Sequence, residues 1–421
     1  MPEVGVTGTP VIDPSTNTLY VVSKSVIVSG PTFFQRLHAI DLTTGNEKLS
    51  GPATIGATYP GTGDGSSTTT FVPQVENQRP GLALVNGTVY IAWASHEDVP
   101  AFGVTPPFYG WIAGYDASTL TQTSVFNVDP NVPSSPSTEG VGDGGIWMAG
   151  GAPAADSSGN LYVITANGAY DPTTSNYGDT LLQLSPTLGF SNNYFTPTDQ
   201  LTDDENDVDF GSGGPVLVDL PANGGNPTHL AIGGGKDATL YVLNRDALGG
   251  LGNPWQQKYI GSTGFHGIFA TPAFWNSTLY ISTYKGQLEA FTLSPSTANL
   301  TQRSDVSPET FAKFGPTPAV SSTPTDSNGI VWIIDAAQYC TTGAPSCGPA
   351  VLRAYDATNL ANELWNSSAG AGNSAGNAVK FTVPTVANGK VYVGTRGNNA
   401  GGADNSTTTP GELDVYGLLP N

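Results

Sequence analysis

Short apolar runs, each the length of one β-strand, recur along the chain and alternate with residues that favour turns. Valine, isoleucine, threonine and tyrosine, which favour strands, dominate these runs. Turn pairs such as Asn86-Gly87 and Asn388-Gly389 precede several of them, which is typical of β-hairpins. Helix-forming residues do not recur at helical spacing. The pattern therefore predicts an all-β protein.

Each run is the middle of a larger repeated unit. A step that carries a proline comes first, at Pro10, Pro80, Pro153, Pro215, Pro272, Pro318 and Pro384. The apolar run follows, starting at Leu19, Val89, Leu161, His229, Leu279, Val331 and Val391. A further strand comes after a variable loop, at residues 37–41, 112–116, 181–184, 240–244, 288–291, 352–356 and 413–416.

Seven units of this kind predict a β-propeller of seven four-stranded blades, with eight blades as the alternative. One sheet cannot bury both of its faces alone, and radial stacking of sheets solves this problem. We expect a single domain over residues 1–421, with blades at roughly 1–55, 76–130, 145–200, 207–258, 265–303, 312–366 and 378–421.

The composition supports this fold and limits the classes of binding partner that we expect. The chain of 421 residues has 53 glycines and 33 prolines but only 11% charged residues, which suits strands joined by many turns. Its net charge of −20 argues against nucleic acid or an anionic membrane as a partner. No window approaches 18 continuous apolar residues, so we expect no membrane span.

Several features favour a secreted, extracellular or periplasmic protein. Lysine is scarce and the loops are rich in serine, threonine and asparagine, although residues 1–5 lead directly into a strand without a signal peptide. Cys340 and Cys347 lie in one loop, CTTGAPSC. Their spacing allows a local disulfide in an oxidising compartment, and two free thiols are the alternative.

The segment HAIDLTTGNEKL (38–49), with an Asp-x-x-Thr-Gly turn after a strand, resembles the repeat of quinoprotein-type (PQQ-like) propellers. YDASTL (115–120) and YDATNL (355–360) are weaker copies of it. Other stretches are similar to secreted bacterial and fungal members of unknown activity. The resemblance covers essentially the whole chain and implies a propeller fold, but many unrelated functions occur on this fold.

The last unit supplies only three strands, ending near residue 421. Propellers of this family close their last blade with a strand from the N-terminus. Either the last blade is three-stranded, or a segment or blade is missing from the N-terminal side. An incomplete blade would leave an open strand edge and a route to self-assembly.

Basic residues are predicted to gather on one face of the propeller. Loops that enter the innermost strand and loops that join the second and third strands lie on the same face. The predicted ligand-binding residues there are Arg79, Trp147, Lys236, Lys285, Lys313, Lys380 and Arg396. We interpret them as a cationic pocket for a glycan or another anionic small ligand, walled by aromatic rings. The alternative is that these charges pair with acidic neighbours and line a wet channel.

Catalytic candidates depend on whether the protein is an enzyme, which the sequence leaves open. In that case His266 and His96 are candidate bases, Tyr109 a candidate acid and Arg79 a candidate for neutralising charge. His38 and His229 lie inside strand patterns, so we expect them to be structural. The acidic run 199–209 is a candidate for calcium, but a solvated loop fits it better because the EF-hand spacing is absent. We therefore assign no metal site and no cofactor.

Three functions fit these features. The favoured one is a non-catalytic module that binds carbohydrate or another anionic ligand, or that takes part in an extracellular assembly. A carbohydrate-active enzyme, such as a lyase acting on a uronate polysaccharide, is the first alternative. A PQQ-dependent dehydrogenase is the second, and PQQ is disfavoured because the chain lacks the vicinal cysteine pair of the larger alcohol-oxidising members, and only Trp365 preserves the tryptophan of the repeat.

Overall fold

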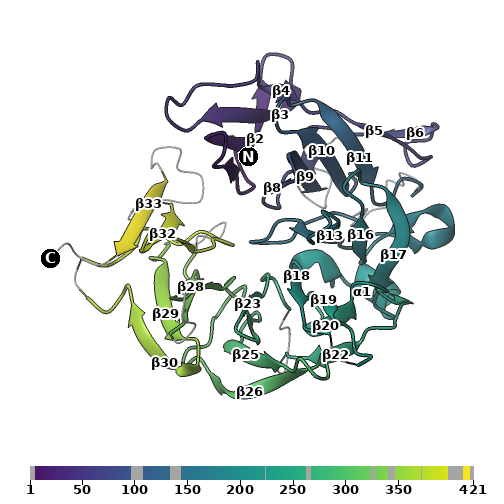
Figure 1. The fold of residues 1–421 in the computed structure, drawn as a ribbon. Coiled ribbons are helices and arrows are strands. Elements are labelled where there is room, and N and C mark those ends of the chain that lie inside the picture. Colours follow the sequence, from purple (N-terminus) through teal and green to yellow (C-terminus); the bar gives the residue numbers. More distant parts are fainter. Residues whose placement is uncertain are drawn as a thin grey trace. The chain divides into compact units, whose positions relative to one another are not determined.

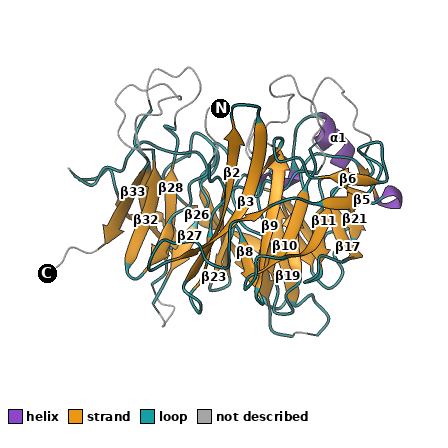
Figure 2. Cartoon of the chain, turned by 90° about the horizontal axis from the view of Figure 1, so that it is seen from above, coloured by secondary structure: helices purple, strands orange, loops and turns teal. Residues whose placement is uncertain are grey.

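A computed structural model describes residues 5–95, 108–132, 144–222, 224–261, 267–323, 328–339, 347–370, 372–396 and 411–417. Strands and loops make up nearly all of this part of the chain (Figure 2). One short helix, α1, spans Gln200–Glu205, and 3-10 turns span Pro172–Thr174 and Phe210–Ser212. No helix in the described residues is long and apolar enough to cross a bilayer.

Seven small, mainly antiparallel sheets follow one another along the described chain, accompanied by two two-stranded ribbons. This is the arrangement of a seven-bladed β-propeller, and it confirms the predicted fold class. The chain divides into two compact units, which are described separately. Unit 1 comprises residues 1–217 and 245–254, and unit 2 comprises residues 218–244 and 255–421.

Unit 1 contains the first three sheets, drawn from purple to teal in Figure 1. The first consists of β1 (Val11–Asp13), β2 (Thr18–Ile27), β3 (Thr32–Asp41) and β4 (Ala53–Thr54). The second consists of β7 (Glu76–Asn77), β8 (Ala83–Val85), β9 (Thr88–Ser95), β10 (Trp111–Asp116) and β11 (Gln122–Asn127). The third consists of β12 (Ala154–Ala155), β13 (Leu161–Ile164), β16 (Leu181–Leu184), β17 (Phe190–Thr196) and β21 (Gly250–Leu251). The ribbons are β5 (Thr58–Pro60) with β6 (Thr68–Thr70), and β14 (Tyr170–Asp171) with β15 (Asn176–Tyr177).

Unit 2 contains the other four sheets. They are β18 (Val216–Asp219), β19 (His229–Gly234), β20 (Thr239–Asn244) and β22 (Gln256–Tyr259); β23 (Ala273–Trp275), β24 (Thr278–Ser282), β25 (Leu288–Leu293) and β26 (Leu300–Val306); β27 (Ala319–Ser321), β28 (Ile330–Asp335), β29 (Val351–Asp356) and β30 (Asn359–Asn366); and β31 (Thr385–Ala387), β32 (Lys390–Thr395) and β33 (Glu412–Gly417). The seventh sheet thus has three strands in the described part of the chain.

The hydrophobic core lies between successive sheets. In unit 1, Leu37 of β3 belongs to one buried cluster with Val89 and Trp93 of β9. In unit 2, Leu288 of β25 is clustered in the same way with Val331 of β28. Each sheet therefore buries its apolar side chains against a neighbour, as the repeat predicts.

Tyrosine hydroxyls link neighbouring sheets at equivalent positions. Tyr20 on β2 donates to the Ala117 carbonyl, 2.6 Å away, at the turn after β10. Tyr90 on β9 donates to the Pro186 carbonyl (2.6 Å), and Tyr280 on β24 donates to the Ala357 carbonyl (2.8 Å). In these three runs the tyrosine thus packs its ring in the core and ties its sheet to the next turn.

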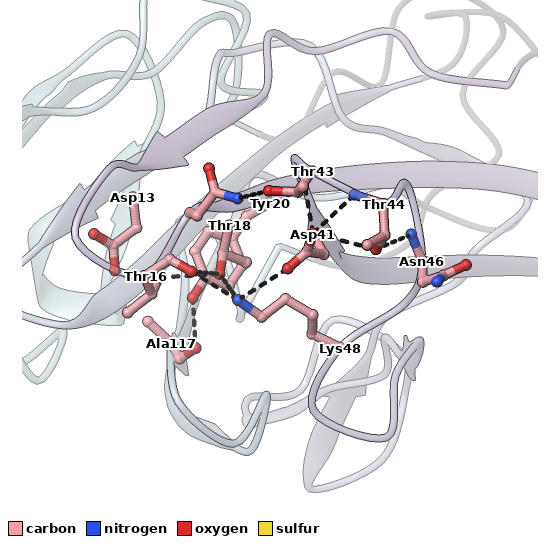
Figure 3. A network of polar contacts seen from close by, with 11 residues as sticks. Asp13, Thr16, Thr18, Tyr20, Asp41, Thr43, Thr44, Asn46, Lys48 and Ala117 are labelled. Carbon is pink, nitrogen blue, oxygen red and sulfur yellow. Dashed lines mark hydrogen bonds and ion pairs between the residues drawn. The ribbon is translucent and has the colours of Figure 1, made fainter.

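The Asp-x-x-Thr-Gly motif forms the turn after β3 (Figure 3). Asp41 Oδ1 accepts hydrogen bonds from the Thr43 and Thr44 amides, each at 2.9 Å, and Gly45 has φ of +72°, which glycine adopts without steric cost. Lys48 then folds back and donates to the Thr16 carbonyl (2.7 Å) and to Thr18 Oγ1 (2.8 Å). The motif that carries the family resemblance is therefore a structural turn.

We expect Tyr20→Phe to lower the free energy of unfolding by about 1 kcal/mol, the usual net contribution of one hydrogen bond. The substitution removes the link to Ala117 and keeps the ring in the core. Urea unfolding monitored by fluorescence measures the change. Tyr392→Phe is the matched control because the Tyr392 side chain, on β32, is half-buried and its hydroxyl makes no hydrogen bond within the described residues. Equal losses in the two variants would contradict the role of the hydroxyl link.

Candidate functional site

Five aromatic rings form a cluster in unit 2, on loops next to the inner ends of its sheets. Phe314 lies at the centre, with ring centroids 5.0 Å from Phe269, 5.2 Å from Phe381, 5.6 Å from Tyr284 and 5.8 Å from Tyr339. Most of these contacts are edge-on or tilted, the geometries that aromatic pairs prefer. Phe269 is buried and the other four rings are half-buried, so the cluster is partly open to solvent.

Three lysines place their ammonium groups against these rings. Lys380 Nζ lies 4.2 Å from the ring centroid of Phe314 and 4.8 Å from that of Phe381. Lys313 Nζ lies 4.7 Å from the Tyr339 centroid, and Lys285 Nζ lies 5.1 Å from the Tyr284 centroid. These are cation–π distances, so the rings hold the positive charges in place. The cation–aromatic cluster is defined here as these three lysines and five aromatic residues.

The loops that carry the cluster are tied closely together. The Tyr284 amide donates to the Gly267 carbonyl at 2.9 Å. A Cβ at Gly315 would lie 2.4 Å from the Ser282 carbonyl oxygen, so only glycine permits this approach next to Phe314. The close packing of these backbones brings rings from three sheets of unit 2 into contact.

Two members of the cluster have left-handed backbone conformations. Lys285 has φ of +57° and Phe381 has φ of +65°. A bulky residue rarely adopts this region, and each instance costs about 1–3 kcal/mol. Strain of this kind gathers at functional sites, and here it fixes the direction of one lysine and one ring.

The lysines of the cluster were candidates from sequence, whereas most of its rings were not. A signal for the others is present: each lysine is adjacent in sequence to a ring, in Tyr284-Lys285, Lys313-Phe314 and Lys380-Phe381. Lys313-Phe314 and Lys380-Phe381 occupy equivalent loops, before β27 and before β31, so alignment of the repeats reveals these two pairs, whereas Tyr284-Lys285 lies in the loop between β24 and β25.

Unit 1 brings together two other predicted ligand-binding residues. The guanidinium carbon of Arg79 lies 5.6 Å from the ring centroid of Trp147. Both side chains are half-buried, with Arg79 after β7 and Trp147 before β12. This pair forms a separate small cation–aromatic contact.

Tyr109 is fully buried in unit 1. Its hydroxyl donates to Asp64 Oδ1 at 3.1 Å, and its amide donates to Glu76 Oε1 at 3.2 Å. Glu76 Oε1 also accepts from Trp111 Nε1, and Lys24 Nζ donates to the Glu76 carbonyl at 3.0 Å. Burial lowers the pKa of Lys24 to about 8. In this structure Tyr109 is part of a buried polar network between strands.

The other predicted residues have varied positions. Lys236 is half-buried in the turn between β19 and β20, and Arg396 follows β32 with its amide donating to the Asn377 carbonyl. Cys347 is disulfide-bonded. Cys340, His96 and His266 lie outside the described residues.

The acidic run 199–209 folds against buried carboxyl groups of unit 1. Asp129 and Asp179 are fully buried, and burial raises the pKa of each well above its ordinary value. Burial also raises the pKa of Asp204, on α1, to about 6. No group of three or more histidine, cysteine or acidic side chains in the described residues has the arrangement of metal ligands.

These carboxyls predict that the stability of unit 1 falls as the pH rises. A carboxyl that stays protonated in the folded state but ionises in the unfolded chain favours unfolding above about pH 4. The loss of stability that Asp204 contributes as the pH rises is complete near pH 6, where its folded-state pKa lies. We expect Asp129→Asn to raise the free energy of unfolding at pH 8 by about 1–3 kcal/mol, because the amide needs no proton to be neutral.

Chemical denaturation between pH 4 and pH 8 measures this effect. Asp13→Asn is the matched control, since hydrogen bonds from Ser15 and Thr16 lower the pKa of the exposed Asp13 carboxyl. Its contribution has the opposite sign and is lost as the pH falls. An unchanged pH profile in Asp129→Asn would contradict the assignment.

Comparison with known proteins agrees with the fold. No protein family model matches the sequence, and no curated protein matches it. The solved structure of a quinohemoprotein alcohol dehydrogenase from Pseudomonas putida HK5 matches with a TM-score of 0.53 and 15% identity, over 95% of this chain and 71% of that one. BamB from Moraxella catarrhalis matches with a TM-score of 0.43 and 12% identity, over 93% of this chain and 94% of that one. The likeness to the dehydrogenase shows a shared quinoprotein-type propeller fold.

Proposed function

We propose that the protein is an exported binding module that recognises an acidic carbohydrate through the cation–aromatic cluster of unit 2. The observation that carries this proposal is the convergence of Lys285, Lys313 and Lys380 on five rings. The chain has only 14 lysine and arginine residues and a net charge of −20. Three positive charges on one aromatic cluster are therefore a local exception to the charge of the whole chain.

The chemistry of the cluster suits an acidic sugar. Ring faces and edges pack against the apolar C–H surface of a pyranose, and ammonium groups donate charge-assisted hydrogen bonds to carboxylates. Lys285 and Lys380 are exposed and Lys313 is half-buried, so all three side chains reach the surface of unit 2. The strained backbone at Lys285 and Phe381 pre-organises both kinds of contact, which limits the entropy lost on binding.

Binding is favoured over catalysis at this cluster because three of its five rings belong to phenylalanines, which can pack against a sugar but cannot transfer a proton. Burial raises the pKa of Tyr339 above its ordinary value, which makes it a weaker source of protons near neutrality. Tyr109, the candidate acid of a lyase, is buried in unit 1. Export is proposed on the scarcity of lysine and on the disulfide at Cys347, since disulfides persist in oxidising compartments.

Isothermal titration with an oligogalacturonate and with a neutral galacto-oligosaccharide of equal length tests the proposal. We expect only the uronate to bind, with an affinity that decreases as salt is raised. Lys380→Gln and Lys313→Gln should each weaken binding by about tenfold, because a hydrogen bond to a charged group contributes roughly 1.5 kcal/mol. Phe314→Leu should weaken it further by opening the centre of the cluster.

Lys390→Gln is the matched control, since Lys390 is an exposed lysine of unit 2 on β32, outside the cluster. Its affinity should equal that of the unmodified chain. Equal binding of the neutral and acidic oligosaccharides, or equal losses in Lys380→Gln and Lys390→Gln, would overturn the proposal.

A further inference from the structure

A serine, a histidine and a glutamate are joined by hydrogen bonds on the first sheet of unit 1. They are distant in sequence from the lysines and rings of the cation–aromatic cluster. Ser23 lies on β2, His38 lies on β3 and Glu47 follows the turn after β3. The His38 and Glu47 side chains are 23% and 31% exposed, and Ser23 is half-buried. All three are therefore within reach of solvent.

The register of the two strands places Ser23 and His38 on the same face. Val21 pairs with His38 and Ser23 pairs with Arg36, so His38 is the diagonal neighbour of Ser23. Alternate residues of β2, such as Val22, point to the buried face. Diagonal neighbours on one face of an antiparallel pair are close enough for long side chains to touch.

The turn after β3 brings Glu47 back to His38. The Asp41 amide donates to the Asn46 carbonyl at 2.9 Å, and the Lys48 amide donates to the Ala39 carbonyl at 2.7 Å. Residue 47 consequently forms an isolated β-bridge with Ile40. The Asp41 turn is thus the support that holds Glu47 in place.

The contacts among the three side chains follow the order nucleophile, base and orienting acid. Ser23 Oγ lies 2.8 Å from His38 Nε2, and His38 Nδ1 is hydrogen-bonded to Glu47 Oε1. A carboxylate only accepts, so Nδ1 carries the proton, and Nε2 of the neutral ring is left to accept the proton of the serine hydroxyl. This is the relationship by which an adjacent base activates a serine.

We propose that Ser23, His38 and Glu47 form a hydrolytic site for carboxylic esters. Arg36 is directly opposite Ser23, with its guanidinium 4.6 Å from the Phe34 ring centroid and Nη1 donating to Ser25 Oγ at 2.9 Å. Because Arg36 is the cross-strand partner of Ser23, we assign its positive charge to stabilising the oxyanion that the reaction forms there. The half-buried Val21, two residues before Ser23 on the same face of β2, suits a short apolar acyl group.

The reaction proceeds in two balanced steps. Ser23 Oγ forms a bond to the ester carbonyl carbon while His38 Nε2 takes the hydroxyl proton. The bond from that carbon to the alcohol oxygen breaks, and His38 returns the proton to the departing alcohol. Water then adds to the acyl-serine with His38 again as the base, and the carboxylic acid and the free Ser23 hydroxyl are released. Glu47 is a positioning residue that holds the ring and stabilises its protonated form.

Covalent labelling with a fluorophosphonate tests the nucleophile directly on the full chain. We expect mass spectrometry to find the label on Ser23, and hydrolysis of p-nitrophenyl butyrate to be lost in parallel with labelling. Ser23→Ala should abolish both, and His38→Gln should slow both by about 10²- to 10⁴-fold, the usual contribution of a general base. Glu47→Gln should slow the reaction and alter its pH profile, whereas a purely structural Glu47 would change only the thermal stability.

Ser29→Ala is the matched control because Ser29 is an exposed serine of the hairpin that joins β2 and β3. The Ser29→Ala variant should be labelled on Ser23, and should hydrolyse the ester, at the same rates as the unmodified chain. Near-ultraviolet circular dichroism establishes that each variant is folded. Labelling of Ser23 no faster than that of other serines, or ester hydrolysis unchanged in folded Ser23→Ala, would overturn the proposal.

Discussion

Burial of each sheet against its neighbour is the constraint on which the rest of both units depends. A sheet of three to five short strands has too little apolar surface to be stable alone, so its faces must be covered by adjacent sheets. The same strand residues meet this need repeatedly, with aliphatic side chains in the clusters and a tyrosine whose hydroxyl reaches the next turn. Tyr20 and Tyr280 are the tyrosines most easily recognised from sequence, because each belongs to a Leu-Tyr pair in its apolar run.

This constraint determines where chemistry can occur. Strand residues that face a neighbouring sheet are fixed by packing, and the loops between strands are free to carry charged and aromatic side chains. The cation–aromatic cluster has this origin, since Phe314 and Phe381 lie on loops that lead into inner strands. The half-exposed face of the first sheet is a second place where polar side chains can reach solvent, and Ser23 and His38 lie on it.

The sequence predicted the fold well because one signal was repeated seven times. It also placed Lys285, Lys313 and Lys380 on loops near one another, since the order of strands in a repeat is enough for that step. The rings beside these lysines were missed because an aromatic residue next to a charged one has no fixed meaning until the loops are superposed. Tyr109 was a candidate acid only if the protein is an enzyme. The structure buries it, with its hydroxyl donating to Asp64 and its amide to Glu76, and no sequence pattern reveals these partners.

His38 shows a different limit of sequence reasoning. Its place inside a strand pattern suggested a structural role, and the contact with Ser23 depends on a register that hydrophobic alternation alone does not specify. A shift of one residue would move every side chain of β3 to the opposite face. The position of Glu47 depends further on the turn at Asp41, so three levels of local structure must be known before the contact is visible.

The left-handed backbone at Phe381 has a consequence for how this protein would respond to directed evolution. Glycine adopts φ near +65° without steric conflict, so Phe381→Gly would remove about 1–3 kcal/mol of backbone strain. The same change deletes a ring that contacts both Phe269 and Phe314. Backbone strain and ring packing therefore oppose each other at this one residue, and selection that keeps phenylalanine at 381 keeps the strain along with the ring.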